Sequence, residues 1–209
     1  MSKEKIILIG AGGHAESCID VIEQEDRFEI AGLIGLENEI GQNRLGYKII
    51  GTDGDLLGVS KSIPNALITT GQIKTASLRV KLFELAKSLN FKMPSVISPK
   101  AYVSPHANIG IGTIVMHGSQ VNAGARIGIN CIINSRSLIE HGVNIGDHCH
   151  LATGVVINGN VSIGDETFVG SGSVMKEGII VGESCVVGMG LSLLTNLDNG
   201  QIFLGGVRE

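Results

Sequence analysis

The chain has 209 residues, of which 43% are hydrophobic and 17% charged, and its formal net charge is −4. This length and balance are typical of one large or two small globular domains, and a mildly acidic chain without runs of like charge gives no sign of nucleic-acid binding. Thirty glycines and no tryptophan are unusual for an ordinary core, so the composition indicates a repetitive structure with many tight turns.

The first ten residues contain a charged start and an apolar run of only about five residues, which is too short for a signal peptide or a membrane span. The four cysteines, Cys18, Cys131, Cys149 and Cys185, have neither the spacing of a metal motif nor the density of a secreted disulfide scaffold. We therefore expect a cytoplasmic protein with free thiols and no association with membranes.

Residues 6–9 form a continuous apolar run, and a turn containing Gly10, Gly12 and Gly13 follows it. The next residues have the apolar spacing of a helix, so this segment predicts a strand, a phosphate-binding turn and a helix. Further elements are expected in chain order as strands at 28–34, 47–50 and 66–70 and a helix at 78–89. The pattern predicts a small Rossmann-like parallel α/β domain over residues 1–95.

From residue 97 onward, every sixth residue is aliphatic or Met at seventeen consecutive positions, without an insertion. These positions are Ile97, Val103, Ile109, Val115, Val121, Ile127, Ile133, Ile139, Ile145, Leu151, Ile157, Ile163, Val169, Met175, Val181, Val187 and Leu193. Because a six-residue unit cannot bury its aliphatic side chain alone, three units must close a triangular coil and the coils must stack. Residues 96–209 are therefore expected to form a parallel β-helix of about five to six coils.

Glycine or asparagine often follows the aliphatic residue, as at Gly110 and Gly128, and we expect this position to supply the positive φ of a sharp corner. Small residues recur two positions before the aliphatic, and three of the cysteines occupy that place. Their spacing predicts that they stack along one edge for packing. The residues after Leu193 leave the period and are expected to close the last coil.

The glycine turn at 10–14 ends in His14 and has small residues that let a phosphate approach the N–H groups at the start of the helix. It is weaker than a full dinucleotide fingerprint, because Ala15 stands where the third glycine is usual. A dinucleotide site also needs an acid about 20 residues further on, at the end of the second strand, to bind the ribose. Glu37 can fill this place only if the second strand ends late. The alternative is a tight turn that binds nothing.

Three histidines, His141, His148 and His150, lie within ten residues but occupy different places in the repeat, which argues against one metal site within one chain. An imidazole at His141 is suited to general base catalysis at neutral pH. Gly159 follows one full coil later, so it is expected to stack beside His141 and to offer an N–H to an oxyanion. The alternative is that His141 and His150 are solvated turn residues.

The segment 133–174, with INSRSLIEHG at its start, and the GAGGHA turn near the N-terminus together resemble a bacterial family of sugar acetyltransferases. That family includes sialic acid O-acetyltransferases and UDP-4-amino-sugar N-acetyltransferases. The resemblance implies a left-handed β-helix, a homotrimer, acetyl-CoA in a groove between neighbouring subunits, a nucleotide sugar on the N-terminal domain and no metal. The implied site comprises His141 and Glu140 for catalysis, Asn134, His150 and Gly159 for acetyl-CoA, and Gly10, Gly12, Gly13 and His14 for the nucleotide sugar. The spacing after the glycine turn adds Glu37 to the nucleotide-sugar site.

Two departures leave alternatives open. Relatives that bind UDP usually carry an acidic pair where this chain has Ile34 and Gly35, and the presence of His150 favours an amino-sugar acceptor over O-acetylation of sialic acid. Metal-dependent carbonic anhydrases share the repeat, but the residue five after His141 is Gly146 rather than a histidine. A non-catalytic hexapeptide protein is the remaining alternative, and no role is predicted for His117 or His148.

Overall fold

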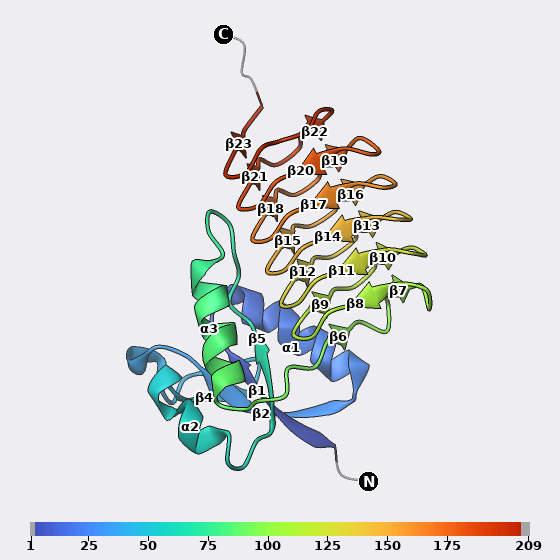
Figure 1. The fold of residues 1–209 in the computed structure, drawn as a ribbon. Helices are drawn as coiled ribbons and strands as arrows, with labels where there is room; N and C mark the ends of the chain where they lie inside the picture. Colours follow the sequence, from blue (N-terminus) through green and yellow to red (C-terminus); the bar gives the residue numbers. More distant parts are fainter. Residues whose placement is uncertain (1–2, 206–209) are drawn as a thin grey trace.

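The computed structural model describes residues 3–205, in which an α/β unit is followed by stacked coils (Figure 1). The elements of the α/β unit are β1 (Glu4–Ile9), α1 (Gly13–Glu25), β2 (Phe28–Ile34), η1 (Glu37–Glu39), β3 (Asn43–Arg44), β4 (Tyr47–Gly51), η2 (Asp53–Asp55), α2 (Leu56–Val59), β5 (Asn65–Ile68) and α3 (Ser77–Ser88). Their sheet has the order β3-β4-β2-β1-β5 and is parallel except for the short β3–β4 pair. The expected small α/β unit is confirmed.

The central strand β1 is apolar throughout its second half because helices cover both faces of the sheet. Ile6 and Leu8 pack with residues of α1, whereas Ile7 and Ile9 pack with residues of α3. All four side chains are fully buried, which explains why the sequence shows a continuous apolar run instead of an alternating one. The carboxyl end of β1 thereby leads directly into the glycine turn.

The array forms three parallel sheets with the orders β22-β19-β16-β13-β10-β7, β20-β17-β14-β11-β8 and β23-β21-β18-β15-β12-β9-β6. Its strands are β6 (Val96–Ile97), β7 (Tyr102–Val103), β8 (Asn108–Ile109), β9 (Ile114–Val115), β10 (Gln120–Val121), β11 (Arg126–Ile127), β12 (Ile132–Ile133), β13 (Leu138–Ile139), β14 (Asn144–Ile145), β15 (His150–Leu151), β16 (Val156–Ile157), β17 (Ser162–Ile163), β18 (Phe168–Val169), β19 (Val174–Met175), β20 (Ile180–Val181), β21 (Val186–Val187), β22 (Ser192–Leu193) and β23 (Ile202–Phe203). Each predicted aliphatic is the second residue of a strand from β6 to β22. The β-helix is therefore confirmed with its predicted register.

The interior of the coils is filled by these aliphatic side chains together with the small residues that precede them. The predicted cysteine ladder is part of this packing, and all three cysteines in it are free and buried. Each thiol donates to a carbonyl oxygen of the next coil, as Cys131 does to Gly146 at 3.2 Å and Cys149 to Gly164 at 3.1 Å. The ladder thus satisfies backbone acceptors that lie close to an apolar interior.

The prediction that the residue directly after each aliphatic supplies the positive φ of the corner was wrong. The left-handed residues lie three positions after the aliphatic, as at Gly112, Gly124 and His148, and not directly after it. Glycine directly after the aliphatic is needed for close approach between coils, because a β-carbon on Gly128 would lie 2.6 Å from the carbonyl carbon of Gly146. The sequence pattern shows that a position needs a small residue. It does not show whether the reason is a positive φ or a close neighbour on the next coil.

The residues after Leu193 close the last coil, as expected, with a shorter period. Strand partners in the body of the array are eighteen residues apart, for example Val121 and Ile139. In the last coil the offset falls to sixteen, as between Val187 and Phe203. A bridge between Val181 and Leu197 has the same shortened offset.

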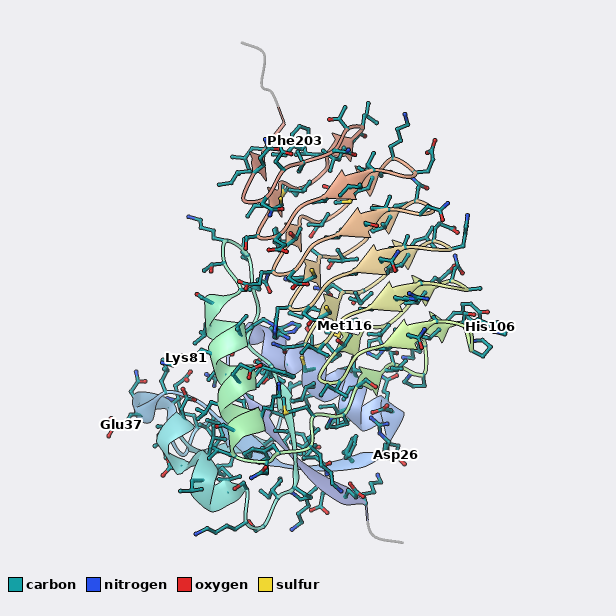
Figure 2. The ribbon with its side chains drawn as sticks, viewed as in Figure 1. Asp26, Glu37, Lys81, His106, Met116 and Phe203 are labelled. Atoms are coloured by element: carbon teal, nitrogen blue, oxygen red, sulfur yellow. The ribbon has the colours of Figure 1, made fainter. Side chains whose placement is uncertain are left out.

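Helix α1 packs against the first coils, where Val96, Ile114 and Met116 join its apolar face in one cluster (Figure 2 labels Met116). A polar bridge lies beside this cluster. His117 Nε2 is 2.8 Å from Asp20 Oδ2 on α1, and His117 Nδ1 is 2.6 Å from Ser98 Oγ. The hydrogen bond from His117 lowers the pKa of Asp20. His117, to which the sequence assigned no role, therefore joins the two parts of the chain.

No helix within residues 3–205 is long and apolar enough to cross a membrane.

Candidate active site

The first group of predicted site residues, which we call the corner cluster, consists of Glu140, His141 and Gly159. His141 follows β13, and its side chain is 68% exposed. Its ring lies against the backbone of Gly159, since a β-carbon at that position would be 2.8 Å from both Cε1 and Nε2 of His141. The stacking predicted from the eighteen-residue spacing is present.

Glu140 is placed to orient the His141 ring. Its Oε2 lies 3.4 Å from His141 Nδ1 and accepts a hydrogen bond from the His141 backbone N–H at 3.3 Å. A carboxylate at Nδ1 favours the tautomer that carries its proton there, which leaves a lone pair on Nε2. The Gly159 N–H donates to no protein acceptor within residues 3–205. The corner cluster therefore combines an exposed base with an adjacent free donor.

The second group, which we call the junction cluster, consists of His14, Gln72, Asn134, His150 and Phe168. His150 lies in β15 and is buried under the segment that follows β5, where its Nδ1 donates to the Gln72 carbonyl oxygen at 2.6 Å. Its Nε2 therefore carries the lone pair, and the Asn134 amide nitrogen lies 3.5 Å away. The ring of Phe168 packs edge-on at 5.2 Å between centroids, which fixes the His150 ring further.

Both histidines of the junction cluster are held uncharged. Burial lowers the pKa of His150 to about 4, and burial followed by the nearby charge of Arg79 lowers the pKa of His14 to about 3. The two rings lie 6.3 Å apart. His14 Nε2 and Gln72 Oε1 are buried without a hydrogen-bond partner among the described residues. The junction cluster can therefore accept hydrogen bonds from a ligand, but it cannot supply a positive charge at neutral pH.

The two clusters lie on different sheets of the β-helix within one chain. His141 follows β13, whereas His150 belongs to β15 in the sheet that faces the α/β unit. No hydrogen bond or ring contact links the two clusters within residues 3–205. The structure thus brings Asn134, His14 and His150 together, and separately brings Glu140, Gly159 and His141 together.

A cavity of about 260 Å³ lies at the carboxyl end of the parallel sheet beside the glycine turn. Its lining consists of Gly10, Ala11, Gly12, Ile34, Gly35, Leu36, Glu39, Asp53, Thr70, Leu78 and Leu82. This edge of an open α/β sheet is where such folds bind ligands. The cavity therefore coincides with the turn that the sequence predicted to bind phosphate.

The glycines of the turn have different reasons to be glycine. Gly10 has φ of 119°, and a β-carbon there would lie 2.8 Å from the Thr70 nitrogen. A β-carbon on Gly12 or Gly13 would meet nothing within 4 Å, so these residues leave open space at the start of α1. No side chain caps α1 at Gly12. The N–H groups of Gly13 and His14 thus remain free for an anion, whereas the Ala15 N–H donates to the Gly12 carbonyl oxygen at 2.9 Å.

Glu37 is exposed at the outer edge of the α/β unit (Figure 2) and does not line the cavity. Glu39 lines it instead, but its carboxylate is already used, since Oε1 pairs with Arg44 at 3.1 Å and Oε2 accepts from the Leu36 N–H at 3.0 Å. Asp53 contributes a second carboxylate. The sequence identified the correct strand end but not which acid reaches the cavity.

Sequence reasoning missed Gln72, Arg79 and Asn130, which connect the α/β unit to the coils. Asn130 donates from its amide to His148 Nδ1 at 2.9 Å, and His148 packs edge-on against Phe83. His148 thus belongs to this contact between the α/β unit and the coils.

Within residues 3–205, no group of three His, Cys, Asp or Glu side chains is arranged to hold a metal ion.

Comparisons with known protein families match the α/β unit and the coils separately. Residues 5–84 match the family model of the PglD N-terminal domain, and residues 124–158 and 160–195 match the hexapeptide repeat of succinyl-transferase. No curated protein sequence matches the chain.

Solved structures match over nearly the whole length. A variant of perosamine N-acetyltransferase from Caulobacter crescentus, in complex with CoA and GDP-perosamine, is 27% identical with a TM-score of 0.91, covering 98% of this chain and 95% of that one. The acetyltransferase domain of PglB from Neisseria gonorrhoeae, in complex with acetyl coenzyme A, is 26% identical with a TM-score of 0.89, covering 98% and 97%. WeeI from Acinetobacter baumannii, at 22% identity and a TM-score of 0.73 over 96% and 97%, shares the fold.

An α/β unit with a free helix start, docked on a β-helix that exposes a histidine, is the architecture of a hexapeptide acyltransferase. The two family models and the matched structures then identify the family. The chain belongs to the proteins that combine a PglD N-terminal domain with hexapeptide repeats, and the solved structures that it matches over nearly its whole length are acetyltransferases.

Proposed function

We propose that this protein transfers the acetyl group of acetyl-CoA to the amino group of a nucleotide-activated amino-deoxysugar in surface glycan biosynthesis. The observation that carries the proposal is the corner cluster, in which an exposed imidazole has a carboxylate at Nδ1 and a free backbone N–H beside its ring. The match to perosamine N-acetyltransferase, at 27% identity, supports an amino group as the acceptor. The match to the PglB acetyltransferase domain bound to acetyl coenzyme A supports the donor.

In the proposed reaction the amine nitrogen attacks the thioester carbon while His141 Nε2 takes a proton from it. A bond between nitrogen and carbon forms, the carbonyl oxygen becomes an oxyanion, and the Gly159 N–H donates to that oxygen. The bond between carbon and sulfur then breaks, and the thiolate receives the proton and leaves as CoA thiol. Glu140 keeps the His141 ring in the tautomer that can accept the proton.

The junction cluster is proposed to hold the acetyl end of acetyl-CoA. His150 is neutral and rigid, with its Nδ1 proton engaged by Gln72, so it can direct its remaining nitrogen and the Asn134 amide toward a bound group. Because the two clusters lie on different sheets of one chain, we propose a homotrimer in which His141 of one subunit faces the junction cluster of a neighbour.

The nucleotide sugar is proposed to bind with its diphosphate at Gly10, Gly12, Gly13 and His14, in a domain comprising residues 1–95, while residues 96–209 form the acetyltransferase domain. The open space at the start of α1 and the adjoining cavity support this placement. A role for Glu37 at the ribose requires a change in the position of its side chain on binding. A cytoplasmic location is part of the proposal and agrees with four free cysteines.

The test is the release of CoA thiol from acetyl-CoA in the presence of UDP-, GDP-, dTDP- and CMP-linked amino sugars. We expect thiol release with an amino-sugar acceptor and a mass increase of one acetyl group on nitrogen, unaffected by a chelator. The His141→Ala variant should retain its fold, because the side chain is exposed, and should lose turnover by roughly 10²–10⁴-fold.

Acetylation of a hydroxyl group on sialic acid, with no reaction of amino sugars, would overturn the choice of acceptor. Chelator-sensitive CO₂ hydration without thiol release would overturn the transferase itself. Near-normal turnover by the His141→Ala variant would remove His141 from the role of base.

A further inference from the structure

Arg79 on α3 is almost completely buried, at 1% exposure, and it has no acidic partner among the described residues. Its guanidinium donates to four neutral oxygens, at 3.1 Å to Ile68 O, 2.5 Å to Thr70 O, 2.9 Å to Asn130 O and 2.7 Å to Asn130 Oδ1. Its Nε has no partner among residues 3–205. A buried cation without a carboxylate is energetically unfavourable, so a chain that retains one needs a compensating reason.

The hydrogen bonds of Arg79 connect the wall of the nucleotide cavity to the β-helix. Thr70 lines the cavity, and its nitrogen lies 2.8 Å from the place where a β-carbon on Gly10 would stand. The adjacent Thr69 hydroxyl donates to Gly10 O at 2.6 Å. Arg79 therefore supports the strand end on which the glycine turn rests, while Asn130 fixes it to the coils.

The charge of Arg79 acts on the groups around the glycine turn. After burial, it is the next cause that lowers the pKa of His14, and it also contributes to the low pKa of His150. Arg44, the other arginine at the turn, donates to Ala11 O but is paired with Glu39 at 3.1 Å. Residues 10–15 contain no lysine or arginine of their own. Unlike Arg44, Arg79 therefore holds a positive charge near the turn that no acid of residues 3–205 neutralises.

We propose that Arg79 is a positioning residue for the nucleotide sugar, and that its fixed buried charge stabilises the diphosphate bound at the glycine turn. This inference rests on the proposed function. Opposite charges attract more strongly across a protein interior than across water, so a dianionic group at the turn would supply the counter-charge that the fold lacks. In the unbound protein the buried charge is unfavourable. In the bound protein the same charge favours a diphosphate over an uncharged ligand.

The test compares two ways of removing this charge. Arg79→Met deletes it, and Asn130→Asp leaves the arginine but places a carboxylate where the amide oxygen lies 2.7 Å from its guanidinium. Binding of GDP and UDP is measured by calorimetry beside that of guanosine and uridine, which lack the phosphates. Both variants should weaken the diphosphate by about tenfold or more and the matching nucleoside by less than about twofold.

Two controls separate charge from shape. Arg79→Lys keeps the charge and should recover most of the diphosphate affinity, although it cannot make all four hydrogen bonds. Lys81→Met removes an exposed charge on the side of α3 away from the coils (Figure 2) and should leave both affinities unchanged. Circular dichroism identifies a variant that does not fold.

The outcomes are distinguishable. Equal weakening of nucleoside and diphosphate would show that Arg79 only maintains the shape of the cavity, and an Asn130→Asp variant that binds the diphosphate like the wild type would also overturn the proposal. If Arg79→Met does not fold, the Asn130→Asp variant decides. Failure of the wild-type chain to bind either diphosphate would instead contradict the nucleotide-sugar function.

Discussion

The imidazole of His141 lies on the backbone of Gly159, close enough that a β-carbon at 159 would stand 2.8 Å from two of its ring atoms. These residues are eighteen positions apart and belong to neighbouring coils, whose strands β13 and β16 are paired. The position of the candidate base is therefore set by the absence of a side chain on the next coil.

Replacement of Gly159 by alanine should displace the His141 ring without unfolding the protein, because the obstructed group is the end of an exposed side chain. A displacement of about 1 Å can cost about 10²-fold in rate, and we expect a fall of that order in kcat. Steady-state kinetics and thermal melting measure the two effects. Gly58→Ala, whose β-carbon would meet nothing within 4 Å, is the control. Unchanged kcat in Gly159→Ala would contradict the contact.

The Glu140→Gln variant tests the orientation of the ring. Removal of the carboxylate at 3.4 Å from His141 Nδ1 should lower kcat by about 10–10²-fold, because the wrong tautomer becomes accessible, with little change in the KM for acetyl-CoA. This effect is smaller than in a buried triad because Glu140 is partly exposed. An increase in KM with constant kcat would assign Glu140 to binding.

Stability should decrease in mild acid because His150, like His14, is held uncharged in the folded chain. Its pKa is about 4 in the folded chain but about 6.5 when unfolded, so the unfolded state binds more protons between these values. The free energy of unfolding should therefore fall as the pH drops from about 6.5 to about 4. Urea midpoints at several pH values measure the slope, which should be shallower in His150→Gln. His106→Gln, at the outer edge of the first coils (Figure 2), is the control; equal slopes in both variants would contradict the assignment.

Two glycine substitutions distinguish close approach from backbone conformation. A β-carbon on Gly146 would lie 2.8 Å from the Asp165 nitrogen, so Gly146→Ala should force the coils apart and lower the free energy of unfolding by about 1–3 kcal/mol. Gly154 has φ of 71° and open space, so Gly154→Ala should cost only about 1 kcal/mol of backbone strain, and an asparagine there less. Urea unfolding compares them, and a larger loss at Gly154 would reverse the explanation.

The coils could be predicted from the sequence because their interior admits one aliphatic side chain per six residues, and residues from Ile97 to Leu193 obey that rule without a break. The stacking of Gly159 on His141 followed from the same arithmetic. The dihedral angles could not be predicted in this way. A glycine such as Gly128 is required by its neighbour on the next coil and not by its own φ.

The contacts between the two parts of the chain could not be predicted. His150 and Gln72 are 78 residues apart, and Arg79 and Asn130 are 51 apart, so neither pair belongs to a local pattern. Only the docking of α1 and α3 on the coils brings them together. For the same reason the sequence indicated an acid at the end of β2 but not that Glu39 and Asp53, instead of Glu37, line the cavity.

The shortened last coil has a consequence for how the molecule meets its copies. Stacked parallel strands present open N–H and C=O groups at the end of the pile, and a second array of the same period could continue them. The terminal pair of Val187 and Phe203 is only sixteen residues apart, so the last coil is two residues shorter than the coils below it. A second array with the eighteen-residue period would therefore meet a terminal coil of shorter perimeter, and such a mismatch disfavours end-to-end stacking.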